Sequence, residues 1–437
     1  MEYIPNILFL IILAFGIGYF ARNIKKLIRN IKLGKAIDAS DNKGERWRNM
    51  ARIALGQSKM VKRPIAGLLH IVVYVGFIII NIEVLEIIID GLFGTHRIGL
   101  KVLPESVYGF LIGAFEILAV LVLVSVVVFW LRRNVIKLKR FLSSEMKGWP
   151  KNDGNIILYF EVVLMCLFLL MNATDTTFQN LGHGNVISQF IAPWFGDNPD
   201  TLHMIERTAW WLHIVGILIF LNYLYFSKHL HILLAFPNTY YGSVEPKGKF
   251  NNLEAVTNEV KLMMDPNADP FAAAPEGAEN EIPAKFGASD VMDLNQIQLL
   301  NAYTCTECGR CTSACPANLT GKKLSPRKIM MDTRDRLEEV GKNIDANGGE
   351  FKDDGKQLLG DYITNEELWA CTTCNACVEE CPVSINPLSI ILEMRRYLVM
   401  EQSAAPMELN NMMTNIENNG APWPYNQMDR LNWANED

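Results

Sequence analysis

Five long apolar segments dominate the first half of the chain, and they predict helices that cross a membrane. Each is a nearly continuous hydrophobic run of roughly the 20 residues that a helix needs to span the hydrocarbon core of a bilayer. The five runs are residues 5–20, 64–89, 105–131, 154–172 and 208–226. No run of this kind follows residue 237. One alternative stays open, in which the fourth run is a buried helix of a soluble domain.

The basic residues between these runs predict how the helices are oriented. Thirteen Lys and Arg lie between Arg22 and Arg63, and seven lie between residues 132 and 151. The connections at 90–104 and 173–207 hold only two and one. Because basic connections stay on the cytoplasmic side, we expect five crossings with the amino terminus outside and the carboxyl-terminal part cytoplasmic, in a bacterial inner membrane.

Eight of the nine cysteines form two copies of the pattern C-x2-C-x2-C-x3-C-P, in "CTECGRCTSACP" and "CTTCNACVEECP". In this pattern three closely spaced thiolates bind one iron–sulfur cubane, while the fourth cysteine ligates the other cluster. We therefore predict two [4Fe–4S] clusters. The first would be held by Cys305, Cys308, Cys311 and Cys381. The second would be held by Cys371, Cys374, Cys377 and Cys315.

Zinc sites and disulfides explain these cysteines less well. A structural zinc ion needs only four ligands and rarely shows this spacing with proline, and the reducing cytoplasmic side disfavours disulfides. The ninth cysteine, Cys166, stands alone in the fourth apolar run and is expected to be a small buried side chain.

The two cysteine motifs are separated by 55 residues that show helical periodicity in "LSPRKIMMDTRDRLEEV" and "LGDYITNEELWA". A spacer of this length resembles the α-helical ferredoxin module of succinate dehydrogenase, of the glycerol-3-phosphate dehydrogenase membrane subunit and of heterodisulfide reductase. The resemblance implies that helices carry the two cluster loops and hold the clusters close enough for rapid electron transfer.

Four histidines are candidate ligands at the membrane. Polar rings in apolar segments are costly unless they bind something, and paired histidines commonly hold b-type haem between helices. His70 lies near the start of the second run, and His213, His229 and His231 lie in or just after the fifth. In a continuous helix the eighteen residues from His213 to His231 make five turns, so these two would share a face and His229 would point away. The other three histidines are expected to be solvated.

The stretch "HIVGILIFLNYLYFSKHLHI" resembles the last helix of the γ subunit of respiratory nitrate reductase, whose haem ligands are also eighteen residues apart. In that family the second helix carries two further ligands ten residues apart. This chain has His70, but Ile80 stands in the place of the second. The resemblance implies one haem b held by His70 and His231. A second haem and a haem between His70 and His213 remain alternatives, as does quinone binding by His229 or His213.

Three further stretches extend the resemblance over nearly the whole chain: "HLHILLAFPN", "LLNAYTCTECGRCTSACPANLTGKKLSPRKI" and "NIENNGAPWPYNQMDRLNWA". They resemble the heterodisulfide reductase membrane-type family, which includes electron-transfer-flavoprotein:menaquinone oxidoreductases. The resemblance implies an all-α protein, with a five-helix membrane bundle followed by an α-helical ferredoxin domain. It also implies a respiratory electron-transfer subunit between a cytoplasmic redox partner and the (mena)quinone pool.

Fused members of this family continue into cysteine-rich CCG repeats, and no CCG pair occurs in this chain. We therefore expect a separate CCG-type iron–sulfur protein, or a flavoprotein such as electron-transfer flavoprotein, as the partner that carries substrate catalysis. The expected parts are a haem-binding membrane domain (1–236), a linker (237–292), the ferredoxin domain (293–400) and a partner-docking tail (401–437). The linker either wraps the ferredoxin domain or acts as a tether.

Two other functions stay open. The chain could be a membrane-anchored ferredoxin scaffold without quinone chemistry of its own. It could also move protons or ions, for which deep carboxylates are candidates: Glu83, Glu86, Asp90, Glu116 and Glu161. The net charge of −6 and the lack of a basic patch with interleaved aromatic residues argue against nucleic-acid binding. The expected partners are instead a redox protein, quinone and membrane lipid.

Overall fold

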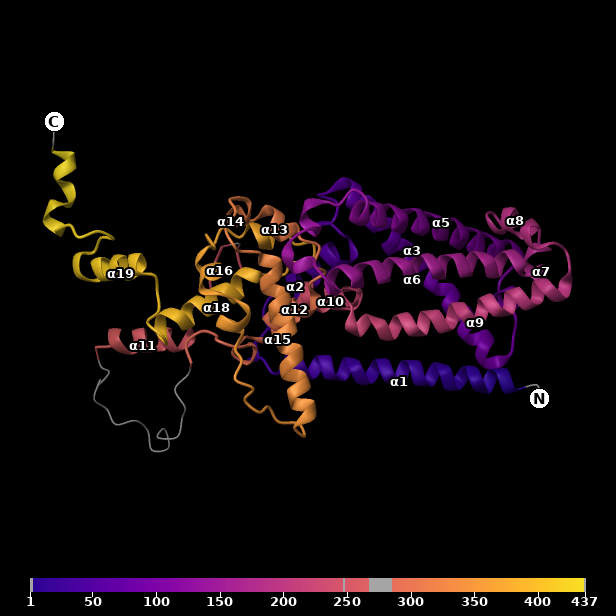
Figure 1. The fold of residues 1–437 in the computed structure, drawn as a ribbon, viewed down its shortest axis with the longest axis horizontal. Coiled ribbons are helices and arrows are strands. Elements are labelled where there is room, and N and C mark those ends of the chain that lie inside the picture. The colour runs from indigo at the N-terminus through magenta and orange to yellow at the C-terminus, as the bar shows by residue number, and fades with distance from the viewer. Residues whose placement is uncertain (1–2, 247, 267–284, 436–437) are drawn as a thin grey trace.

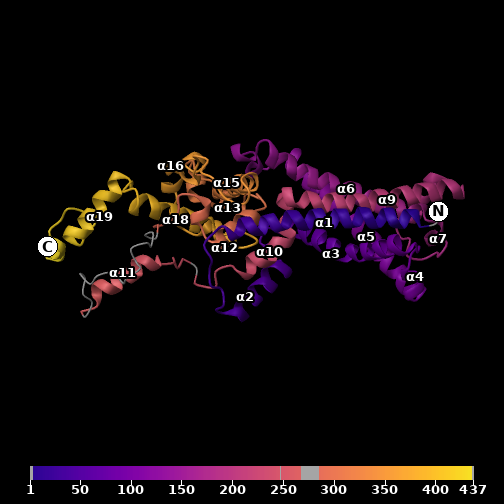
Figure 2. The same ribbon diagram turned by 90° about the horizontal axis from the view of Figure 1, so that it is seen from below.

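The structure, a computed structural model, describes residues 3–246, 248–266 and 285–435. The regular elements in these ranges are helices, and they form two bodies (Figures 1 and 2). One is a bundle of long helices, and the other is a compact group of shorter helices at one end of that bundle. The amino terminus lies at the other end of the bundle. The predicted all-α class is confirmed, while the middle of the predicted linker lies outside the described residues.

Five long helices have the length and composition to cross a membrane, with mean hydropathy between 1.6 and 2.8 over their most apolar 18 residues. They are α1 (Ile4–Lys32), α3 (Pro64–Phe93), α5 (Glu105–Asn134), α6 (Trp149–Thr174) and α9 (Pro199–Tyr223). Each helix packs against the next in this order, and α9 packs back against α1. The predicted five-helix bundle is therefore confirmed, and the fourth apolar run belongs to it as α6.

Local sequence signals set several ends of these helices. Proline stands in the first turn of α3, α6 and α9, where its missing N–H is not needed. The side chain of Asn198 caps α9 by accepting from the backbone N–H groups of Asp200 and Thr201. Gly94, with φ of +68°, ends α3 in the left-handed conformation that glycine adopts without strain.

Short helices fill the connections. At the end of the bundle where the amino terminus lies these are α4 (Gly99–Val102), α7 (Thr176–Gln179) and α8 (Ser188–Ile191). At the end that meets the second body, α2 (Lys43–Met50) continues into a turn of π-helix before α3. The described part of the linker contains α11 (Glu254–Met264), and α19 (Met407–Asn419) follows the ferredoxin body.

The continuous helix predicted from His213 to His231 is wrong. A 3₁₀ turn follows α9, and then Ser227 adopts an extended conformation with φ of −116° and ψ of 148°. The Ser227 hydroxyl oxygen accepts from the backbone N–H of His229 at 3.1 Å, which favours a new turn over continuation of α9. A separate helix, α10 (His231–Tyr240), starts at His231. The two histidines therefore lie on different helices, so helix periodicity does not relate their directions.

The second body contains both cysteine motifs. Its helices are α12 (Gln296–Thr304), α13 (Arg310–Ala314), α14 (Pro316–Leu319), α15 (Pro326–Ala346), α16 (Asn365–Trp369), α17 (Ala376–Glu380) and α18 (Pro387–Met400). The spacer between the motifs forms α15 and α16, as its periodicity predicts. The apolar face of α15 packs against α12 and α18, and its Ile329 and Leu337 are completely buried there.

The carboxyl-terminal end of α1 joins the two bodies. After α1 the backbone N–H of Lys35 donates to the carbonyl of Leu294 at 2.8 Å, and Gln296 donates back to Lys35 at 3.0 Å. Within α1, Asn30 is only 1 % exposed and donates to the Tyr303 hydroxyl at 2.9 Å. Because buried polar groups need such partners, these bonds fix α1 against the second body.

Buried ion pairs also hold the bundle and the second body together, at a different place from α1. Lys228 forms an ion pair with Glu307, and Arg334 pairs with the same carboxylate at 2.8 Å. Burial alone would raise the pKa of Glu307, but the two cations outweigh it and hold that pKa below its ordinary value. Arg327, completely buried, pairs with Glu145 at 2.7 Å. Removing one partner of such a pair typically costs about 3–5 kcal/mol, so the charges favour one docked arrangement.

Replacing Gly341 by Leu is expected to weaken the contact between α1 and α15. A Cβ at position 341 would lie 2.5 Å from the side-chain nitrogen of Asn30, which would disturb the bond to Tyr303. Overpacking costs about 1–3 kcal/mol and a buried unpaired amide about 1–3 kcal/mol. Together they exceed the gain in helix propensity of about 1 kcal/mol.

The matched control for this prediction is Ala346→Leu, at an exposed position of the same helix. Thermal unfolding of the detergent-purified protein should show a lower midpoint for Gly341→Leu than for the control. Equal midpoints for the two variants would contradict the proposed packing of α1 on α15.

Candidate functional site

The two cysteine motifs fold into the same local structure. In the first motif Glu307 and Gly309 have φ of +54° and +70°, and in the second Thr373 and Asn375 have +55° and +60°. Glycine and asparagine tolerate this left-handed conformation better than most residues. Gly309 directly precedes α13 and Asn375 directly precedes α17. Each motif is therefore a tight loop followed by a short helix.

The structure brings together the thiols that the sequence assigns to each cluster. Electrostatic interactions link Cys381 to the first three cysteines of the first motif: Cys305, Cys308 and Cys311. They likewise link Cys315 to two cysteines of the second motif: Cys371 and Cys377. The helices α13 and α17 pack against each other, and this packing carries the last cysteine of each motif to the other loop.

The surroundings of these thiols fit a cationic cluster. Cys305 and Cys381 line one pocket with the other two cysteines of the first set. Burial raises the pKa of Cys305 to about 12 and that of Cys381 to about 11. Four thiolates in such a place require positively charged iron close by, because metal coordination is what deprotonates buried thiols. The donor set therefore suits a [4Fe–4S] cluster.

The second cysteine site opens to the surface. Cys374 is exposed, whereas the first motif packs against connections of the membrane bundle, at Lys59 and Arg140. Cys374 also borders a broad surface groove that Arg46 and Tyr241 help to line. The second site is therefore the one that a soluble protein can approach. The ninth cysteine, Cys166, is exposed on α6 and not buried as expected.

Three of the four candidate histidines meet at the end of the bundle that adjoins the second body. The rings of His70, on α3, and His231, at the start of α10, have centres 6.4 Å apart. The ring centre of His229 lies 5.4 Å from that of His231. The Nδ1 atom of His231 lies 3.1 Å from the carbonyl of Lys228, which leaves its Nε2 for a ligand.

The pair formed by His70 and His231 fits an axial pair of a haem. Bonds of about 2 Å from a metal to a nitrogen of each ring would place the ring centres roughly 6 Å apart. The Nδ1 atom of His70 is buried and has no hydrogen-bond partner among the described residues. Both rings are half-buried, and burial lowers the pKa of the adjacent His229 to about 3, which favours the neutral form of that ring. Neutral imidazole is the form that binds a metal.

His213 lies apart from these three. Its ring is 2 % exposed, stands 6.2 Å from the ring of Phe168 on α6, and interacts with the backbone of Leu164. The described residues include no ring contact between His213 and His70, so the alternative axial pair is not brought together. Ile80 is buried in α3, as its apolar side chain requires.

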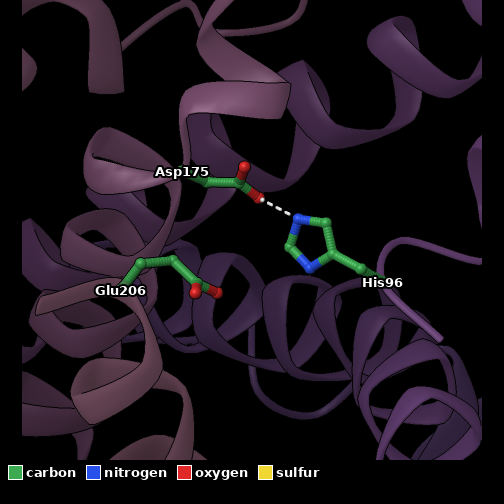
Figure 3. A group of neighbouring side chains, drawn as sticks. All are labelled: His96, Asp175 and Glu206. Atoms are coloured by element: carbon green, nitrogen blue, oxygen red, sulfur yellow. Dashed lines mark ion pairs between the residues drawn. The ribbon is translucent and has the colours of Figure 1, made fainter. Parts of the chain in front are cut away.

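A second group of candidate ligands lies at the opposite end of the bundle, where the amino terminus lies. Figure 3 shows the side chains of Asp175 and Glu206 on the same side of the His96 ring, and Nε2 of His96 lies 3.2 Å from a carboxylate oxygen of Asp175. Their ligand atoms lie within 4.8 Å of one another, a distance that a metal ion could bridge. However, Arg97 donates to Asp175 at 2.5 Å, and Arg207 forms an ion pair with Glu206. Because both carboxylates are already neutralised, the geometry favours an ion-pair cluster that closes the bundle.

The deep carboxylates have mainly structural contacts. Glu116 accepts from the Asn172 side chain at 3.2 Å and from the backbone of Ile187 and Ser188 at 2.7 and 3.1 Å. It therefore anchors α8 to α5. Glu83 is 3 % exposed, and one of its oxygens has no hydrogen-bond partner among the described residues.

The sequence analysis missed the charged residues around the first cysteine motif. Lys228, Glu307 and Arg327 contribute to the buried junction, and Arg310 donates to the turn before α3. No spacing rule separates these residues from the other charges of the inner connections. The only signal was that Glu307 and Arg310 stand inside the motif itself.

Comparison with known proteins supports the cysteine site. Residues 304–385 match the model of the 4Fe-4S dicluster domain family. A probable iron-sulfur-binding oxidoreductase, FadF, of Bacillus subtilis is 30 % identical over 98 % of this chain and 61 % of its own length. The EtfAB:quinone oxidoreductase of Syntrophomonas wolfei is 27 % identical over 88 % of this chain and 53 % of its own. A probable membrane-anchored ferredoxin of Chromohalobacter salexigens is 33 % identical over 35 % of this chain and 24 % of its own.

The chain thus spans about half to three-fifths of the length of the first two relatives. No solved structure matches it. The predicted resemblance to iron–sulfur oxidoreductases that include a quinone-linked member is confirmed, as is the ferredoxin domain with two clusters. The chain is therefore a membrane protein with a 4Fe–4S dicluster domain, homologous over nearly its whole length to an iron–sulfur-binding oxidoreductase and to EtfAB:quinone oxidoreductase.

Proposed function

We propose that the chain is an electron relay between a soluble redox partner and a (mena)quinone pool in the membrane. In this proposal the eight cysteines hold two [4Fe–4S] clusters, and His70 and His231 hold haem b. Each of these groups, when bound, carries one electron at a time. The observation that carries the proposal is the 6.4 Å separation of the two imidazole rings at the inner end of the bundle, next to the first cysteine motif.

The contact between the two sites supports a continuous relay. Arg310, inside the first motif, donates to the carbonyls of Lys59 and Met60 at 3.2 and 3.4 Å, in the turn that leads into α3. Arg310 also interacts electrostatically with His70 on that helix. The exposed Cys374 marks the other end of the module. The sites therefore follow one another from the protein surface to the membrane.

The protein's own residues prepare the histidine site. The carbonyl of Lys228 orients the ring of His231 through Nδ1, and α3 supplies His70 from the opposite side. His229, next to His231, is in position to hydrogen-bond a quinone headgroup. His213 remains part of the bundle interior and is proposed for neither role.

The proposed orientation places the amino terminus outside and the ferredoxin domain in the cytoplasm of a bacterial cell. It is supported by the basic connections, which lie at the ferredoxin end of the bundle, and by the amino terminus at the other end (Figure 1). The partner is proposed to be a separate CCG-type iron–sulfur protein or a flavoprotein such as electron-transfer flavoprotein. The described tail offers exposed Trp423 and Trp433 to such a partner.

The second candidate function is a membrane-anchored ferredoxin, in which the bundle only tethers the clusters. The similarity of part of the chain to a protein of that name favours it. The two functions differ in the histidine site, because a tether has no need for paired imidazoles with a free nitrogen.

Replacing His70 or His231 by Ala should remove haem b from the purified protein, since each change deletes one of two axial ligands. The pyridine haemochrome assay should fall from about one haem per chain to none, while the cluster signals in electron paramagnetic resonance persist. The matched control is His203→Ala, at an exposed position of α9. If the native protein, purified under mild conditions, contains both clusters but no haem, the tether function is correct instead.

Replacing Cys374 by Ser should destabilise only the second cluster. We expect non-haem iron to fall from about eight to about four atoms per chain, the content of one remaining cubane. Cys166→Ser, on α6, should leave iron unchanged because Cys166 belongs to neither motif. Unchanged iron in the Cys374→Ser protein would refute its assignment as a ligand.

A further inference from the structure

Arginine side chains from three parts of the chain gather around the loop of the first cysteine motif. Arg310 and Arg327 line the same pocket as the four thiols of that site. Arg140, from the connection between α5 and α6, packs against Gly309, where a Cβ would lie 3.3 Å from the Cβ of Arg140. Electrostatic interactions link both Arg140 and Arg310 to Cys308.

Two of these arginines lack a compensating carboxylate. Within the described parts of the chain, neither Arg140 nor Arg310 has a carboxylate at ion-pair distance, and Glu380, which interacts with Arg310 at longer range, pairs with Arg63 at 3.1 Å instead. Arg310 donates to backbone carbonyls, and Nε of Arg140 is buried without a hydrogen-bond partner. Burial lowers the pKa of both groups below the ordinary arginine value, yet guanidinium stays charged in proteins.

The second motif has a different electrostatic environment. Arg395 interacts with Cys371 and donates to the carbonyls of Leu368 and Cys371 at 2.6 and 2.5 Å. The adjacent Cys374 is exposed, so water and dissolved ions screen charges there more effectively than at the buried first site. Arg395 itself has no carboxylate at ion-pair distance within the described residues. Two such cations, Arg140 and Arg310, therefore lie beside the first motif, and one lies beside the second.

Charge near a cluster changes its reduction potential. A [4Fe–4S] cluster gains one negative charge on reduction, and a nearby cation stabilises that reduced form. The stabilisation is larger where protein excludes water, since the local dielectric constant is lower. A cluster with buried, uncompensated guanidinium groups is therefore easier to reduce than the same cluster without them.

We propose that Arg140 and Arg310 are tuning residues, which raise the reduction potential of the cluster held by the first motif above that of the second cluster. Electrons in the ferredoxin domain then reside preferentially at its membrane end. The inference deepens the proposed function, and its meaning for the direction of the relay rests on that function. The potentials themselves depend only on the two clusters.

The test is a redox titration of the full-length protein in detergent, with mediator dyes and electron paramagnetic resonance detection of the two reduced clusters. Arg310→Gln should shift the midpoint of one cluster to lower potential and leave the other unchanged, and Arg140→Gln should shift the same cluster. Arg310→Lys, which keeps the charge, should restore most of the native midpoint. Arg395→Gln, the matched variant at the second motif, should shift the other signal.

The other possible results of the titration would contradict the proposal or be decided by a second variant. Unchanged midpoints in both Gln variants, or equal shifts of both clusters, would overturn the proposal, as would a lower native midpoint for the cluster that responds to Arg310. If Arg310→Gln fails to assemble its cluster, Arg140→Gln alone decides, because Arg140 lies outside the motif. Loss of haem or of quinone reactivity would leave these midpoints measurable, so a failure of the proposed function is distinguishable from a failure of this inference.

Discussion

The rest of the structure depends on how a cysteine site, which becomes negatively charged when its thiols bind iron, is placed against one end of the membrane bundle. Such sites are costly where water is scarce unless cations lie close by. The protein supplies these cations from segments far apart in the sequence, among them Arg140 before α6, Lys228 after α9 and Arg310 within the first motif. The same charges that make burial of the first site tolerable also join the bundle to the ferredoxin body.

This junction gives the two ends of the ferredoxin body different properties. The first site is enclosed by the bundle and by arginines, whereas the second reaches the surface through Cys374. The histidine pair lies on the enclosed side, because α10 follows directly on the segment that supplies Lys228. One packing arrangement therefore places cations beside the first cysteine site, joins the ferredoxin body to the bundle, and sets the order of the cysteine and histidine sites.

Local sequence patterns predicted most of the fold and the thiol sites. The apolar runs identify the five spans because a bilayer requires about 20 apolar residues in a row. The cysteine spacing predicts which thiols lie together in the structure, because three of each set share a tight loop. The burial expected for Cys166 was wrong, and so was the segment from His213 to His231, where apolar composition predicted one helix. There the side chain of Ser227 and the docking of Lys228 against Glu307 outweigh the tendency of α9 to continue.

The sequence by itself determined the number of spans, the helical class and the identity of the eight thiols, since each follows from residues close together in the chain. Only the tertiary structure decided which histidines meet. His70 and His231 are 161 positions apart in the chain, and their approach requires α3 to pack beside the break after α9. The tertiary structure also decided which guanidinium groups have no carboxylate partner. The distance from each guanidinium group to a carboxylate far away in the sequence is set by packing and not by any local pattern.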